Sequence, residues 1–181
     1  MTTIARTISR TGKRYTLPEL EEVEPPAVSR VSLTATAAEL LNQQGQQALS
    51  VDRLLRDPAS GTRLAQRVLI PLSVAADVPG VADTPDAPLP ELYAHFHAAG
   101  HELTWDEEVS AATPLPDERT TLGLTGPEPI LITYRITRDQ ATDRPLMVEE
   151  LRVSAEKARL AYPITPATAA PTKRPRRGQA E

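Results

Sequence analysis

Two arginines in matching local surroundings are the residues of this sequence best suited to bind a charged group. Arg53 lies in SVDRLLRD and Arg135 lies 82 positions later in TYRITRD, and both stretches contain Arg-x-x-Arg-Asp. Strand alternation places Arg53 on the same face as Leu49, Val51 and Leu55, so its guanidinium interrupts an apolar row. A buried guanidinium needs a partner, and its planar fork suits a carboxylate or a phosphate. We therefore predict that Arg53 and Arg135 bind an anion.

The alternative role for both arginines is structural. Buried arginines usually have protein partners, and the strand that follows Arg135 offers Glu149 and Glu150. In that case each arginine pairs with an acid of a neighbouring strand and no ligand is needed. The residues alone leave both alternatives open.

No other pattern in the sequence indicates catalysis or metal binding. His95, His97 and His101 form HFHAAGH, but side chains two positions apart diverge on a helix and Gly100 interrupts before the third, so we expect no metal site. The sequence has no Gly-x-Ser-x-Gly elbow, no phosphate-binding glycine loop and no His-Glu-x-x-His motif. We therefore expect no enzyme activity and no cofactor.

Composition and charge narrow the class of protein. The chain has 181 residues, of which 40% are hydrophobic, and no cysteine; no apolar run approaches the roughly 20 residues of a membrane span, and the first fifteen residues lack the apolar stretch of a secretory signal. We expect one domain in the cytoplasm, away from membranes. The two ends of the chain are basic: four basic residues lie within 6–14 without an acid, and four lie within 173–177 near the single acid Glu181. When these eight basic residues and Glu181 are set aside, the rest of the chain has 12 basic and 23 acidic residues, a net charge of −11. Direct DNA binding by this body is therefore not expected.

The hydrophobic patterns predict an α+β domain, in which an antiparallel sheet is flanked by helices. A helix capped by Thr36 and Glu39 and stopped at Gly45 precedes a strand hairpin, and the same helix–hairpin unit recurs at the offset of 82, which indicates an internal duplication. The expected helices are 34–45, 90–100 and 116–124; the expected strands are 47–57, 62–72, 101–114, 128–139, 144–154 and 156–164; and 73–90 is expected as a loop.

Three regions are expected along the chain. Residues 1–27 form a basic arm, loose over the first fifteen residues unless KRYTL adds an edge strand, and an acidic connector. Residues 28–164 form the folded domain, and residues 165–181 form a disordered basic tail because nothing in them can be buried.

The order of these elements resembles a UTRA domain, the effector-binding domain of HutC-subfamily GntR transcriptional regulators. Residues 89–153 carry the pattern of its second half: an LY helix, a strand, a short helix that ends in LGL, then P-I-L-x-I-x-R and D-x-x-x-x-R-P-x-x-x-E, in this chain PILITYR and DQATDRPLMVEE. Residues 33–71 resemble the matching upstream unit.

The resemblance implies a chorismate lyase-like fold, a homodimer and a small anionic metabolite as ligand. Arg53 matches a strand arginine that meets the ligand in the family, Tyr93 matches the tyrosine at the helix start, and Glu149 approximates the acid of the last hairpin. Gln66 stands where a glutamate is common and Leu55 where a second arginine is common, which argues against a phosphosugar. The implied ligand-binding set is Arg53, Gln66, Tyr93, Arg135 and Glu149.

The expected function is that of an effector-sensing and dimerisation domain in transcription regulation. Full regulators of the family carry a winged helix-turn-helix, for which residues 1–27 are too short, so DNA contact is expected from a separate or full-length regulator as partner. Two alternatives stay open: a chorismate lyase-like enzyme, and a ligand-free interaction module in which Arg53 and Arg135 form internal ion pairs.

Overall fold

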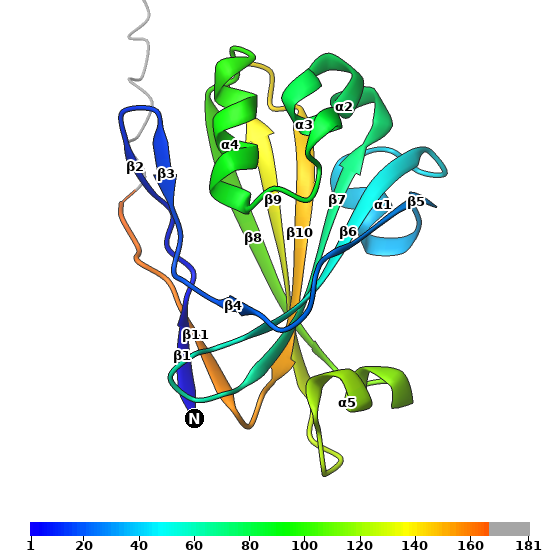
Figure 1. Cartoon of the computed structure of the whole chain (residues 1–181), viewed down its shortest axis with the longest axis vertical. Helices are drawn as coiled ribbons and strands as arrows, with labels where there is room; N and C mark the ends of the chain where they lie inside the picture. Colours follow the sequence, from blue (N-terminus) through cyan, green and yellow to red (C-terminus); the bar gives the residue numbers. More distant parts are fainter. Residues whose placement is uncertain (167–181) are drawn as a thin grey trace, which may run out of the picture.

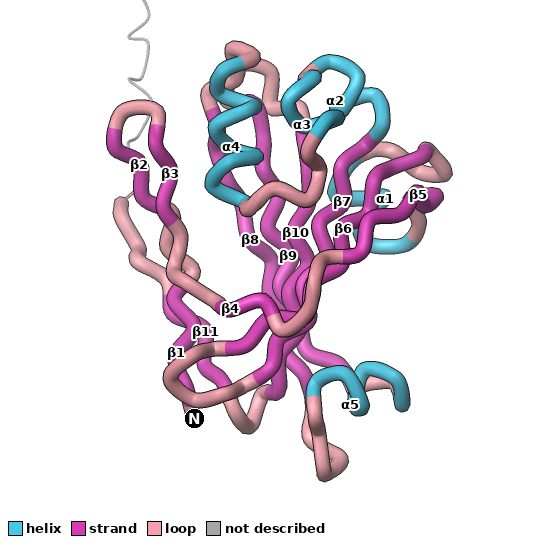
Figure 2. Tube along the Cα trace, viewed as in Figure 1, coloured by secondary structure: helices cyan, strands magenta, loops and turns pink. Residues whose placement is uncertain are grey.

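Two long hairpins form the centre of one antiparallel sheet in the computed structural model, which describes residues 1–166 (Figures 1 and 2). The predicted α+β class and antiparallel sheet are confirmed. Seven strands pair in the order β4-β6-β7-β10-β9-β8, with β5 also paired to β6. Their bounds are β4 Glu21–Glu22, β5 Ala27–Ser32, β6 Gln47–Arg56, β7 Arg63–Pro71, β8 Leu103–Ala112, β9 Ile130–Asp139 and β10 Pro145–Ser154.

The strand register shows the duplication, with one interruption. Arg53 lies opposite Gln66 across β6 and β7. The offset of 82 would put Val148 opposite Arg135, but a β-bulge between Pro145 and Met147 shifts β10, so that Glu149 lies opposite Arg135. Since β7 pairs with β10, the two hairpins meet about a local twofold at the middle of the sheet. The bulge therefore makes Glu149 the spatial counterpart of Gln66.

Helices cover both faces of the sheet. On one face, α2 (Leu72–Asp77), α3 (Pro79–Asp83) and α4 (Leu89–Ala98) pack on Val51, Val68 and Met147. On the other face, α1 (Ala35–Leu41) packs on Leu69 and Val148, and α5 (Pro116–Leu122) packs near the far ends of the strands (Figure 1). None of these described helices is long and apolar enough to span a membrane.

Two local predictions were wrong. The expected loop 73–90 contains α2 and α3, because Val74, Val78 and Val81 recur at helical spacing and are buried, and Pro79 occupies the first turn of α3, where proline is tolerated. The predicted cap of α1 does not form either: Thr34 is the N-cap residue and makes no side-chain cap bond.

The N-terminal arm is ordered, which corrects the expectation that its first fifteen residues are loose. Strand β1 (Thr2–Ala5) pairs in parallel with β11 (Ala158–Ala161), and β2 (Ser9–Thr11) and β3 (Arg14–Thr16) form a hairpin beside α4. The cause is burial, since Ile4 and Tyr15 are 4% and 3% exposed. In Figure 1 the arm runs along the side of the sheet and returns across it through β4. The predicted disordered tail lies, from residue 167 on, outside the described residues.

Candidate ligand-binding site

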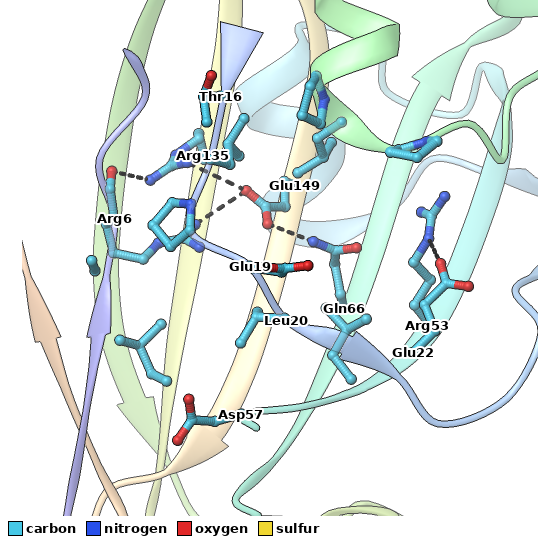
Figure 3. A pocket seen from close by; sticks show the side chains of 18 of the residues that line it. Arg6, Thr16, Glu19, Leu20, Glu22, Arg53, Asp57, Gln66, Arg135 and Glu149 are labelled. Atoms are coloured by element: carbon cyan, nitrogen blue, oxygen red, sulfur yellow. Dashed lines mark hydrogen bonds and ion pairs between the residues drawn. The ribbon is translucent and has the colours of Figure 1, made fainter. Parts of the chain in front are cut away.

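A cavity of about 590 Å³ lies between the arm and the sheet (Figure 3). Its wall on the sheet side includes four of the five predicted site residues, Arg53, Gln66, Arg135 and Glu149. The arm forms the opposite wall through residues 3–6 and 16–22. Sites for small molecules usually occupy roughly 300–1,000 Å³, so this cavity has a suitable size.

Strand parity brings these four side chains together. Arg53 and Gln66 are cross-strand neighbours on β6 and β7, and Arg135 and Glu149 are cross-strand neighbours on β9 and β10. Residues directly opposite each other point to the same face of a sheet. The pairing of β7 with β10 then joins both pairs in one row above the cavity, and the Gln66 amide donates a 2.7 Å hydrogen bond to Glu149.

Two arginines and two glutamates form a buried charge cluster at one end of this row. Arg6, from the segment after β1, donates to Glu107 Oε1 from Nε (2.8 Å) and to Glu149 Oε2 from Nη2 (3.1 Å). Arg135 donates to Glu107 from Nε and to the Arg6 carbonyl from Nη2 (2.7 Å), and its Nη1 lies 3.9 Å from Glu149. All four side chains are at most 9% exposed. The cluster is therefore neutral as a whole and closely paired within the protein.

The cluster stabilises the ionised forms of Glu107 and Arg6. Burial alone would raise the pKa of Glu107, but the hydrogen bond and charge of Arg6 and the charge of Arg135 hold this pKa below its usual value. Burial likewise opposes the charge of Arg6, and the two carboxylates outweigh it, so the Arg6 pKa is raised. Tyr162 also donates to Glu107 (2.8 Å).

Arg53, at the other end of the row, keeps one donor group open. Its Nε donates to Glu22 (3.0 Å), and its Nη2 donates to the carbonyl oxygens of Asp86 (2.6 Å) and Ala87 (3.0 Å). Its Nη1 is buried and has no hydrogen-bond partner among residues 1–166. A buried donor without a partner is costly, by about 1–3 kcal/mol. Arg53 is thus the arginine that has a donor for a further anionic group.

Tyr93 is placed apart from the other four predicted residues. Its ring is fully buried in α4 and packs edge-on against Tyr15 and Trp105, at centroid distances of 5.6 and 5.3 Å. It does not line the cavity. Its hydroxyl finds no hydrogen-bond partner in the described part of the chain, and burial raises its pKa.

Sequence reasoning missed three residues of the site: Arg6, Glu22 and Glu107. Glu107 could have been found, because strand parity puts it opposite Arg135 once β8 pairs with β9. Arg6 shares strand parity with Ile4, which is buried, and this was the only local signal for it. The predicted alternative, in which Arg135 pairs with an acid of a neighbouring strand, is found in part. Arg135 pairs with Glu107 and Glu149, whereas Glu150 points to the opposite face of the sheet.

The described residues contain no group of three or more histidine, aspartate or glutamate side chains placed to hold a metal ion. His97 lies 3.3 Å from Glu102, and His101 lies 3.3 Å from Asp139. The three histidines of the HFHAAGH motif thus have separate surroundings.

The fold is shared with transcriptional regulators, although no family model matches the sequence and no curated protein matches it. A candidate GntR-family transcriptional regulator is 20% identical, with a TM-score of 0.73 over 91% of this chain and 72% of that chain. The effector domain of PhnF from Mycobacterium smegmatis is 22% identical (TM-score 0.60; 77% of this chain, 84% of that chain). The ligand-binding domain of a candidate GntR-family regulator from Bordetella bronchiseptica is 21% identical (TM-score 0.56; 77% and 86%).

Proposed function

With the fold of GntR-family effector domains as the starting point, we propose that this chain is a UTRA-type effector-binding domain of the HutC subfamily, which binds a small metabolite in the cavity beside Arg53. The observation that carries the proposal is the buried Nη1 of Arg53, which has no hydrogen-bond partner within residues 1–166, on a residue that lines the cavity. A carboxylate or phosphate oxygen is the natural acceptor for such a group.

The proposed ligand contacts are unequal along the row. Arg53 binds the anionic group, and Gln66, beside it, offers its carbonyl oxygen because its amide nitrogen is used by Glu149. Arg135 and Glu149 shape the far end of the cavity, since their charges are already paired. Tyr93 supports the wall from the core behind it.

In regulation, the domain would act through a difference in ligand affinity between two states of a homodimer. A ligand shifts such an equilibrium only by its differential affinity for the two states. The described residues offer an acidic body, so we propose that DNA contact is made by a DNA-binding domain or a partner regulator.

A second candidate is a ligand-free interaction module. It is favoured by the complete pairing of Arg135 and Arg6 with Glu107 and Glu149, which needs no ligand. In that case, Arg53 serves to hold the loop before α4 through the carbonyls of Asp86 and Ala87.

A thermal-shift screen against carboxylates, amino acids and phosphosugars separates the two candidates. A ligand at 100 times its Kd adds about 2.7 kcal/mol, which at roughly 2–4 °C per kcal/mol for this size is a shift of several degrees. The shift should be lost in Arg53→Gln. It should remain in Arg56→Gln, a matched control whose side chain is 53% exposed on the same strand and pairs with Glu21 of the same arm strand. A ligand whose shift survives Arg53→Gln would refute the proposed site.

A further inference from the structure

At each end of the site, an ion pair joins a side chain of the arm to a side chain of opposite charge on the sheet. Glu107 and Glu149 project from the sheet, and the cation that bonds both of them is Arg6 of the arm. Arg53 projects from the sheet, and the carboxylate that it bonds is Glu22 of the arm. The sequence separations of 101, 143 and 31 residues show that each contact joins segments that are far apart in the chain.

Without the arm, the sheet would lack one cation and one carboxylate. Arg135 and Glu107 would still pair directly across β8 and β9. Glu149 would keep the Gln66 amide, and only a 3.9 Å approach to Arg135. Arg53 would keep two backbone carbonyls and no carboxylate. A ligand that replaces the arm side chains must therefore carry one positive group and one carboxylate.

The spacing of the two ends limits the ligand's size. Arg53 is on β6 and Glu149 is on β10, and β7 lies between them, so the strands that carry them are about 10 Å apart. The charged groups stand on long side chains above this sheet, within the cavity of about 590 Å³. A short chain with a guanidinium or ammonium at one end and a carboxylate at the other fits this spacing.

A ligand would satisfy a group that the arm leaves open. Glu22 accepts one bond from Arg53 Nε, and its side chain is 47% exposed, whereas Nη1 finds no acceptor in the described residues. A free carboxylate is not tied to a backbone and can reach Nη1 as well. Bidentate guanidinium–carboxylate pairs are among the strongest hydrogen-bonded contacts in proteins.

The arm is attached in a way that allows displacement. Strand β4 has only two residues, both exposed, and β1 pairs with β11 alone in a two-stranded sheet apart from the main one. Segments with few cross-strand partners open at low free-energy cost, so the contacts of Arg6 and Glu22 can open while the buried Ile4 and Tyr15 keep the arm attached.

From these contacts, and resting on the proposed function, we propose that the site binds a zwitterionic ligand of the guanidino- or amino-carboxylate class. In the ligand-free protein, the side chains of Arg6 and Glu22 occupy the positions of the ligand's positive group and carboxylate. The arm and the ligand then compete for the same groups of the sheet. Binding releases the Arg6 and Glu22 contacts of the arm, and this carries the ligand signal to the N-terminal end of the domain.

Calorimetric titration of the full chain tests the ligand class. L-arginine and 4-guanidinobutyrate carry both charges, agmatine lacks the carboxylate, and glutarate lacks the cation. We expect the first two to bind at least tenfold more tightly than agmatine, glutarate or inorganic phosphate. Arg6→Gln should strengthen binding of the zwitterions at least threefold because it removes the competitor. Arg10→Gln is the matched control, since Arg10 lies in the same arm but pairs with exposed Glu102, and it should leave binding unchanged.

A second variant and a second readout keep the test decisive if Arg6→Gln folds poorly. Glu22→Gln, on an exposed two-residue strand, should strengthen binding of 4-guanidinobutyrate and glutarate, both of which carry a carboxylate. Hydrogen exchange of the Arg6 amide, which bonds the Ala161 carbonyl, should accelerate in saturating L-arginine.

Different experimental results would refute the proposed function and the proposed ligand class. If glutarate or phosphate binds most tightly and Arg53→Gln abolishes this binding, the proposed function holds and the zwitterion class is wrong. If Arg6→Gln weakens zwitterion binding, or if exchange of the arm slows on binding, the arm closes over the ligand and the competition is wrong. If none of these probes and no metabolite of the thermal-shift screen binds to wild type, Arg6→Gln or Glu22→Gln, both proposals are refuted.

Discussion

Replacement of Arg135 by glutamine should destabilise the protein strongly, because it leaves a buried negative charge without its partner. The Arg135 side chain is 3% exposed and joins Glu107, the Arg6 carbonyl and Glu149. Without it, the two carboxylates share the single charge of Arg6. Removal of one member of a buried ion pair costs about 3–5 kcal/mol, and for a domain of this size that corresponds to a fall in Tm on the order of 10 °C.

Chemical and thermal unfolding of matched variants measure this effect. Arg138→Gln is the control: Arg138 lies on the same strand, pairs with exposed Asp106 and should cost less than about 1 kcal/mol. The double variant Arg135→Gln with Glu107→Gln should recover part of the loss, since the cluster is again neutral, and the coupling energy follows from the double-mutant cycle. A loss below 1 kcal/mol in Arg135→Gln, or simple additivity with Glu107→Gln, would show that the cluster is solvated and would refute the reasoning.

Three further predictions concern neighbouring parts of the site. The pKa of Glu107 is lowered in the folded state. Its contribution to stability is therefore present above its unfolded pKa of about 4.3 and is lost as pH falls through the lower folded value. The free energy of unfolding should consequently fall less steeply for Glu107→Gln than for wild type below about pH 4.5. Tyr93→Phe removes a buried hydroxyl that has no partner in the described residues, so stability should stay equal or rise by up to roughly 1 kcal/mol, and ligand affinity should not change; a tenfold loss of affinity would show that Tyr93 contacts the ligand. Ile4→Ala should cost about 2–5 kcal/mol in urea unfolding because Ile4 anchors the arm on Leu64 and Leu151, whereas Ile164→Ala, at a position 92% exposed, should cost less than about 0.5 kcal/mol.

The repeat and strand alternation predicted that Arg53 and Arg135 occupy equivalent positions on their strands. The parity of Arg53 and Arg135 follows from the period of two in a strand, and the cavity face carries both. The repeat at the offset of 82 also indicated two equivalent hairpins. Both are local properties of the chain, and for that reason a single sequence contains them.

The register of the second hairpin could not be predicted in this way. A strict repeat would place Val148 opposite Arg135 and turn Glu149 to the other face. One extra residue in the bulge at Pro145–Met147 reverses this outcome. The sequence around the bulge, RPLMVEE, continues an apolar strand pattern on both sides and gives no sign of where the extra residue is accommodated.

The arm was the larger error, because its order depends on contacts with residues far from it in the sequence. Arg6 meets Glu107 and Glu149, and Tyr15 meets Tyr93 and Trp105. Taken alone, MTTIARTISRTGKRY has too few apolar residues to fold, and its four basic residues suggest solvent exposure. Arg6 can be buried because two carboxylates of the sheet, Glu107 and Glu149, pair with it.

The arm also explains why a duplicated motif yields two arginines with different roles. Each arginine bonds a carboxylate from the adjacent strand: Glu22 of β4 for Arg53, and Glu107 of β8 for Arg135. Arg6 enters on the Arg135 side only, where it adds a second cation and its own carbonyl as an acceptor for Arg135. The Arg53 side receives no such addition, so its Nη1 has no acceptor among the described residues. One half of the repeat therefore binds Arg6, and the other half keeps the donor that a ligand requires.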